Sequence, residues 1–118
     1  MLVRNEDPFS QLEGEELATV TFVRDYVQLG FDGPVLTALA PVTVAGPDAV
    51  LKQGMLGFSD ALIALIGQTV RATSFRRDDV VVLSFPDGWS IAISLAPADC
   101  TEPEAVQLRL ADSTLFVV

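Results

Sequence analysis

Two segments of the chain share the pattern of a tight β-hairpin. Residues 27–41 and 81–97 each contain Leu-x-Phe, a turn that ends in Asp-Gly, an apolar return strand, and Leu-Ala-Pro at the exit. Asp-Gly between alternating apolar residues is among the strongest short-range signals for a hairpin, because both residues tolerate the positive backbone angles that such turns need. The two segments therefore predict a fold built largely from antiparallel strands.

The length of the first turn determines which side chains of the first hairpin share a face. A two-residue loop at Asp32 and Gly33 places Leu29 opposite Leu36 on an apolar face. The other face then carries four side chains of mixed polarity: Tyr26, Gln28, Val35 and Thr37. Because this second face is only partly polar, it is the expected surface for a partner.

The second hairpin divides more cleanly into a core face and a solvated face. A three-residue loop places Phe85 opposite Trp89. The large apolar side chains then share one face: Val81, Leu83, Phe85, Trp89, Ile91, Ile93 and Leu95. The other face carries small side chains: Ser84, Ser90, Ala92 and Ser94. This division is typical of an antiparallel sheet with one buried face.

One main helix is predicted over residues 60–66, with Ser59 as its N-cap and Gly67 at its C-terminal end. The helix is apolar all round, so we expect it to be covered on more than one side. Residues 101–104 have the form of a capping box and predict a short helix through Leu108. The expected fold is α+β: an antiparallel sheet built from hairpins, with one main helix packed on one face, in the order β-β-β-α-β-β-β-(α)-β.

Length and composition predict one domain that associates with another protein. The 118 residues suffice for one core but not for two. Residues 1–16 contain five acids and predict a flexible acidic arm, and residues 17–118 are expected to form a single α+β domain. Half of the chain is apolar, so some apolar surface is expected to meet a second subunit or a partner. A homodimer is the default form of such an association.

Charge and the distribution of apolar residues exclude several classes of partner. The net charge of -9 would repel nucleic acid and anionic lipid. No apolar run approaches the roughly 18 residues of a membrane span, and the N-terminus has no secretory leader pattern. Cys100 is the single cysteine, so no intrachain disulfide can form. These features predict a cytoplasmic protein.

The residue types needed for common catalytic sites are scarce. The chain has no histidine, which removes Ser-His and Cys-His pairs and histidine metal ligands. Paired carboxylates remain as an acid–base route, but the acids lie mostly in turns or in the N-terminal arm. Asp32 and Asp87 occupy matching turns, where aspartate is favoured because its side chain bonds to its own backbone. We therefore expect no enzyme activity and no cofactor.

Residues 25–34, DYVQLGFDGP, and residues 57–67, GFSDALIALIG, resemble a family of small uncharacterised bacterial proteins. That family is marked by a DYVQL-x-FDGP hairpin and a G-[FY]-x-D-A-L-x-x-L-I-G helix, and the resemblance covers roughly residues 24–105. It implies a bacterial source and no particular activity, so no site residue is carried over. The helix and second hairpin are also loosely similar to small immunity-type proteins that neutralise toxins.

These observations predict a non-enzymatic protein-interaction domain that acts as a homodimer or with a protein partner. An immunity-like inhibitor of a basic partner is a more specific form of this prediction. The alternative is a small-molecule-binding protein with a pocket between helix and sheet, near Tyr26, Trp89 and residues 54–57. That alternative requires a cavity of roughly 300 Å³ or more.

Overall fold

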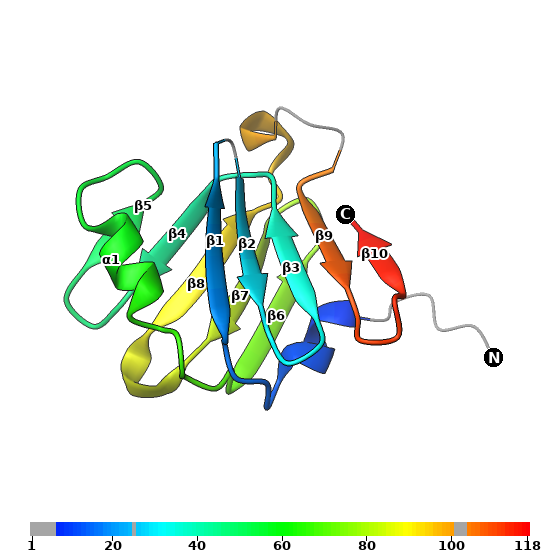
Figure 1. Ribbon diagram of the computed structural model, residues 1–118. Helices are drawn as coiled ribbons and strands as arrows, with labels where there is room; N and C mark the ends of the chain where they lie inside the picture. Colours follow the sequence, from blue (N-terminus) through cyan, green and yellow to red (C-terminus); the bar gives the residue numbers. More distant parts are fainter. Residues whose placement is uncertain (1–6, 25, 101–103) are drawn as a thin grey trace.

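The computed structural model describes residues 7–24, 26–100 and 104–118, and strands dominate this part of the chain (Figure 1). The elements are, in order, η1 (Pro8–Leu12), β1 (Thr19–Val23), β2 (Tyr26–Gly30), β3 (Val35–Ala38), β4 (Val42–Ala45), β5 (Val50–Lys52), α1 (Phe58–Ile63), β6 (Ala72–Arg76), β7 (Val80–Ser84), η2 (Pro86–Gly88), β8 (Ser90–Ser94), η3 (Pro97–Asp99), β9 (Val106–Arg109) and β10 (Leu115–Val117). Here η denotes a short 3-10 helix. The predicted α+β class, antiparallel strands with one main helix, is confirmed.

The strands form two antiparallel sheets, where the sequence analysis expected one. The first sheet has the order β1-β2-β3-β9-β10 and the second has the order β5-β4-β8-β7-β6. Figure 1 shows the first sheet lying in front of the second. Each sheet combines strands that are distant in sequence, since β3 pairs with β9 and β4 pairs with β8.

One apolar core joins the inner faces of the two sheets. The inward side chains of the central strands are at most 2% exposed: Val27, Leu29, Leu36, Ala38, Val106 and Leu108 from the first sheet, and Val42, Val44, Val81, Leu83, Ile91 and Ile93 from the second. Burial of such a side chain contributes about 1.5–3 kcal/mol. No polar or charged residue of the described segments is buried. The apolar face of the first sheet is therefore covered mostly by the second sheet, where we expected the helix to cover it.

Both predicted hairpins are confirmed in position and register. Leu29 pairs with Leu36, and the N–H of Phe31 donates to the carbonyl of Pro34 at 2.8 Å. In the second hairpin the N–H of Phe85 donates to the carbonyl of Trp89 at 2.7 Å. The predicted core face of this hairpin is buried apart from the half-buried Trp89. Turn chemistry at Asp-Gly therefore identified both hairpins correctly.

The helix α1 is shorter than expected and begins differently. Its N-cap is Gly57, in the left-handed region with φ 92°, so the prediction of Ser59 as N-cap is wrong. Leu62 is buried, but Ile63 is 47% exposed and Ile66 is also exposed, so the helix is covered on one side only. It contacts β4 and β5 of the second sheet. No helix in the described segments is both long and apolar enough to cross a membrane.

The short helix that we expected through Leu108 is a strand instead. Residues 106–109 form β9, which pairs with β3 on one side and β10 on the other. The physical reason is the alternation in this segment, where Val106 and Leu108 are buried while Gln107 and Arg109 face outward. Residues 101–103 of the proposed capping box lie outside the described residues.

Residues 7–16 pack against the second sheet, whereas the sequence analysis placed them in a flexible arm. Phe9 and Leu12 of η1 are fully buried, and η1 contacts β6. The carboxylate of Glu13 accepts hydrogen bonds from the N–H of Thr73 at 3.0 Å and from its hydroxyl at 3.2 Å. Phe9 and Leu12 are three residues apart, and this spacing brings side chains to the same side of a 3-10 helix. Residues 1–6 of the expected arm lie outside the described residues.

The buried position of Leu12 predicts a large effect on stability. We expect Leu12→Ala to lower the free energy of unfolding by about 2–5 kcal/mol, because it removes buried methyl groups and leaves a cavity. Leu56→Ala is the matched control, since Leu56 is 99% exposed and its loss should change stability by less than about 0.5 kcal/mol. Urea denaturation of both variants measures the difference. Equal unfolding midpoints for the two variants would show that η1 does not contribute to the core.

Candidate interaction surface

The four side chains predicted to form a partner-binding surface lie on one face of the first sheet. Tyr26 and Gln28 come from β2, and Val35 and Thr37 come from β3. All four are half-buried and point away from the core. Gln28 pairs with Thr37 in register, and its side-chain amide donates to the Thr37 hydroxyl at 3.2 Å. The hairpin register therefore correctly grouped these residues on the outer face.

The C-terminal strands extend this outer face beyond the predicted residues. In register, Thr37 is opposite Gln107, and Val35 is opposite Arg109. Two rows of outward residues cross all five strands. The first row is Thr21, Gln28, Thr37, Gln107 and Val117. The second row is Thr19, Gly30, Val35, Arg109 and Leu115. The contributions of β9 and β10 to this face were not predicted from the sequence, because a helix was expected through Leu108. The alternation of Val106–Arg109 was the signal that could have revealed them.

The centre of the outer face is hollowed. A depression of about 310 Å³ lies between β2, β3, β9 and β10. Its lining residues are Gln28, Val35, Thr37, Gln107, Arg109 and Leu115. Amide, hydroxyl and guanidinium groups therefore alternate with aliphatic side chains around one concave area. Such a lining can both donate hydrogen bonds and bury apolar groups of a partner.

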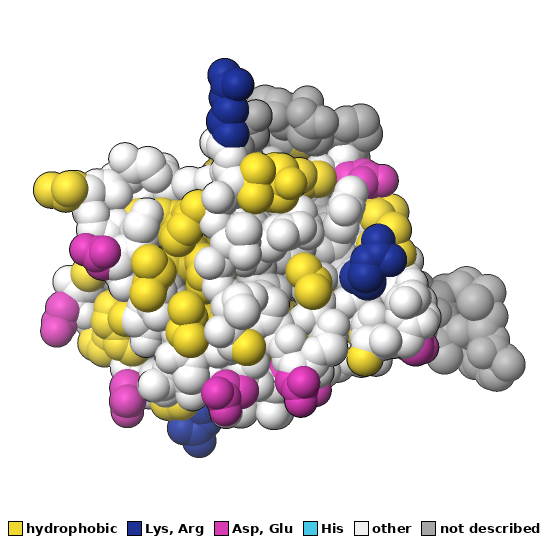
Figure 2. Space-filling view, viewed as in Figure 1, with side chains coloured by type: hydrophobic (Ala, Val, Ile, Leu, Met, Phe, Trp, Pro, Cys, Tyr) yellow, Lys and Arg dark blue, Asp and Glu magenta, His cyan; other side chains and the backbone are white. Residues whose placement is uncertain are grey.

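The outer face carries no acidic side chain among its described strand residues, although the chain has a net charge of -9. Arg109 is the single charged residue in the two rows. Figure 2 views this face and shows a mostly uncharged centre, with Asp and Glu side chains around the margin. The carboxylate beside this face, that of Glu104, accepts a hydrogen bond from the side-chain amide of Gln107 at 2.8 Å and is half-buried.

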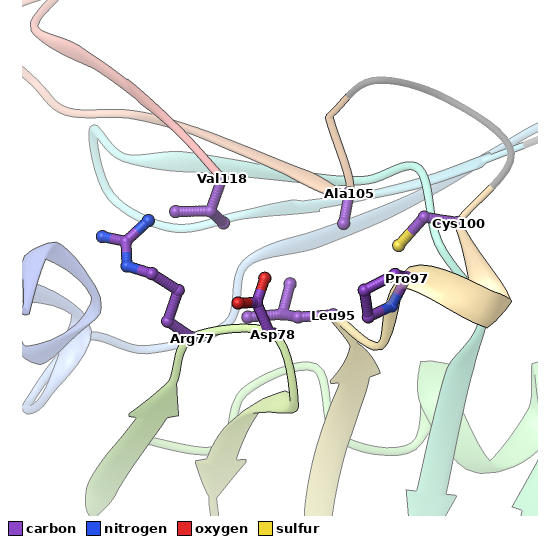
Figure 3. A pocket seen from close by; sticks show the side chains of 7 residues that line it. All are labelled: Arg77, Asp78, Leu95, Pro97, Cys100, Ala105 and Val118. Atoms are coloured by element: carbon purple, nitrogen blue, oxygen red, sulfur yellow. The ribbon is translucent and has the colours of Figure 1, made fainter.

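A separate cavity of about 290 Å³ lies where the two sheets meet near the C-terminus (Figure 3). It is lined by Arg77, Asp78, Leu95, Pro97, Cys100, Ala105 and Val118. Figure 3 shows the carboxylate of Asp78 and the sulfur of Cys100 facing the cavity, with the guanidinium of Arg77 at its side. The guanidinium carbon of Arg77 lies 5.5 Å from the centre of the Phe75 ring, which holds it by a cation–π contact.

The two basic residues of the β6–β7 turn differ in their partners. Arg76 forms an exposed ion pair with Asp79, with 3.3 Å between nitrogen and oxygen. Neither Arg77 nor Asp78 forms an ion pair within the part of the chain that the structure describes. A guanidinium and a carboxylate are therefore both available at the mouth of this cavity.

The pocket expected between helix and sheet is small. A cavity of about 190 Å³ lies between α1 and the β7–β8 turn, below the roughly 300 Å³ typical of small-molecule sites. Trp89 lines it, as the sequence analysis expected, but Tyr26 and residues 54–57 do not. The space beside the helix is therefore smaller than the pocket that the small-molecule alternative requires.

Asp32 and Asp87 are exposed residues of the two hairpin turns, each in a different sheet. Asp87 adopts the left-handed conformation with φ 63° and ψ 28°. Aspartate tolerates this conformation better than most residues, because its short side chain bonds locally. The described residues contain no group of three or more cysteine and acidic side chains that could hold a metal ion. The geometry of Asp87 is explained by the turn alone.

This explanation predicts how Asp87 responds to substitution. Asp87→Val should destabilise the protein by about 1–2 kcal/mol, because a β-branched residue is strained at positive φ. Asp87→Gly should change stability much less, because glycine adopts this conformation without strain. The control is Asp48→Val, at an exposed turn residue without positive φ. If thermal unfolding showed the same loss of stability for Asp87→Val and Asp48→Val, the strain assigned to the positive φ of Asp87 would be contradicted.

The comparisons with known proteins found no match: no protein-family model, no curated protein and no solved structure is similar to this chain. The resemblance of residues 25–34 and 57–67 to a bacterial family therefore stays a prediction. No site is carried to this chain from another protein, and its function is argued from the surface itself.

Proposed function

We propose that the chain is a non-enzymatic, cytoplasmic protein-interaction domain that acts as a homodimer and docks a protein partner on the outer face of its first sheet. One observation carries this proposal: a hollowed sheet face whose strand residues include no acid, on a chain with a net charge of -9. The strands of this face contribute no acid to its centre, and the Glu104 carboxylate beside the face is already paired with the Gln107 amide. A docking surface needs such a centre, because charge that is buried without a partner opposes binding.

The residue types on this face suit recognition of a protein. Val35 and Leu115 offer apolar area, and Gln28, Thr37 and Gln107 offer neutral hydrogen-bonding groups. Interface centres are depleted in Asp, Glu and Lys but enriched in Tyr and Arg, which often dominate the binding energy. Tyr26 and Arg109 supply these two residue types.

The charge distribution also indicates the chemistry of the partner. The acids around the margin of the face and the net charge of -9 attract a basic protein over long range. The centre of the face instead suits an uncharged patch. The proposed partner therefore has an uncharged contact area with Lys and Arg around it. A basic toxin neutralised by an immunity-like protein would be one such partner.

A paired substitution tests this docking face. Thr37→Glu places a carboxylate at the centre of the hollow, and Thr43→Glu places one on the outer face of the second sheet as the matched control. We expect a tagged wild-type chain and Thr43→Glu to retain the same basic protein from a lysate of the native host, and Thr37→Glu to lose it. Quantitative mass spectrometry of the retained proteins measures this.

Two results would count against the docking face. Retention of the same partner by Thr37→Glu and wild type would exclude this face as the site. Retention of no protein by the wild-type chain would count against the interaction function itself. Circular dichroism of both variants checks that each is folded before capture.

The cavity near the C-terminus supports a second candidate function, the binding of a small zwitterion. Arg77 can pair with a carboxylate, and Asp78 can pair with an ammonium group. Leu95, Pro97 and Val118 offer apolar contact to a short side chain between the two charges. A volume of about 290 Å³ limits the ligand to the size of an amino acid.

Leucine is a suitable probe for this second candidate. Leucine should shift the NMR amide signals of residues around Arg77 and Asp78, while 4-methylpentanoate and isopentylamine, which each lack one charge, should have much weaker effects. Arg77→Ala should abolish the leucine shifts, and Arg76→Ala is the matched control, because Arg76 is paired with Asp79. Equal shifts with all three probes, or none with leucine, would contradict a zwitterion site.

A further inference from the structure

Four strands form the edges of the two sheets: β1 and β10 in the first, β5 and β6 in the second. An edge strand presents unpaired backbone N–H and C=O groups that can pair with another chain. Folded proteins protect such edges by shortening them, placing charge on them or covering them. The four edges of this molecule differ in how they are protected.

Three of the four edges are protected. The strands β5 and β10 have only three residues each, and β5 ends in Lys52. The edge of β6 is covered by η1, and the Glu13 carboxylate accepts from the backbone N–H of Thr73 in that strand. β6 also ends at Arg76, and Arg71 precedes it. The edges of β5 and β6 are thus poor templates for an added strand, and β10 is protected by its short length alone.

The five residues of β1 have none of these protections, although Glu16 and Leu17, just before the strand, pair with residues 67–69. Its five residues, Thr-Val-Thr-Phe-Val, include no charge and no proline, and four of them are exposed. Phe22 is opposite Val27 in register and so points to the core side of the sheet, yet it is 44% exposed. Figure 2 shows further apolar side chains between β1 and α1. An inward-pointing aromatic side chain at an open edge is covered when another strand is added beside it.

We infer that β1 pairs antiparallel with β1 of a second copy, centred on Thr21, and this inference rests on the proposed homodimer. A two-fold axis through Thr21 overlaps all five residues of both strands. Val20 of one copy then lies opposite Phe22 of the other on the core side, and the two Thr21 side chains face each other on the outer side. Across antiparallel strands, a pair of an aromatic and a β-branched side chain is favourable, and so is a pair of threonines.

The charges that flank β1 are complementary in this register. Arg24 of one copy lies opposite Ala18 of the second copy, two residues from the second copy's Glu16. Both side chains are exposed, and Glu16 is bridged to Thr69 beside the strand, so Arg24 comes within two residues of an opposite charge at each end of the paired strands. The strand itself has no charge that would face its own copy. A second copy of this chain is therefore the occupant that fits the edge.

Pairing through β1 also extends the proposed docking face. Two five-stranded sheets joined edge to edge form one ten-stranded sheet. Gln28 is opposite Thr21 on the strand next to the edge, so the Gln28 side chains are the β2 side chains nearest the two-fold axis. The two outer faces become one surface that both copies present to a partner.

A charge-swap experiment at Thr21 tests the pairing. Thr21 is exposed, so Thr21→Arg and Thr21→Glu should both remain folded, as checked by circular dichroism. Each variant alone brings two like charges together across the axis, and we expect its dimer dissociation constant to rise by more than about tenfold. An equimolar mixture of the two variants should dimerise again, because Arg then lies opposite Glu. Sedimentation equilibrium measures all three samples and the wild type.

The outcomes separate this inference from the homodimer itself. Ser74→Arg, at an exposed position on the protected edge β6, is the matched control and should dimerise like wild type. If wild type is a dimer but the Thr21 variants are unaffected, or the mixture is not restored, the β1 pairing is overturned and the homodimer stands. If wild type is monomeric at high micromolar concentration, both the homodimer and the β1 pairing are overturned.

Discussion

The burial of one face of each sheet against the other is the interaction on which the rest of this structure depends. Neither sheet can bury its apolar face alone, and the short helix α1 covers only the region of β4 and β5. Leu36 from the first sheet and Ile91 from the second share one core that contains no buried polar group in the described segments. Polar and charged residues are therefore confined to outer faces, edges and turns, where any interaction with another molecule must occur.

Two open sheets also leave four edges, and the way these are protected shapes the surface of the molecule. The N-terminal segment contributes Phe9 and Leu12 to the core, and Glu13 then accepts a hydrogen bond from the edge strand β6. The five residues of β1 have no equivalent cover and adjoin a sheet face whose strands carry no acid. An open edge beside an uncharged face favours association through the first sheet, whereas the second sheet is protected on both sides.

Features that depend on nearby residues could be predicted from the sequence, and features that depend on distant pairing could not. The Asp-Gly turns identified both hairpins and placed Gln28 and Thr37 on one face. The strand at Val106–Arg109 was predicted as a helix, because a capping-box pattern is local evidence whereas its pairing with β3 joins segments about 70 residues apart in sequence. For the same reason Arg109 was missed as part of the face. The open edge of β1 follows only from the complete strand order.

The central claim, association of two copies through the first sheet, is tested most directly by isotope-filtered NMR on a mixture of labelled and unlabelled chains. The account predicts intermolecular contacts between the methyl groups of Val20 and the ring of Phe22, and between the two Thr21 side chains. A dimer whose intermolecular contacts came only from other surfaces would contradict it.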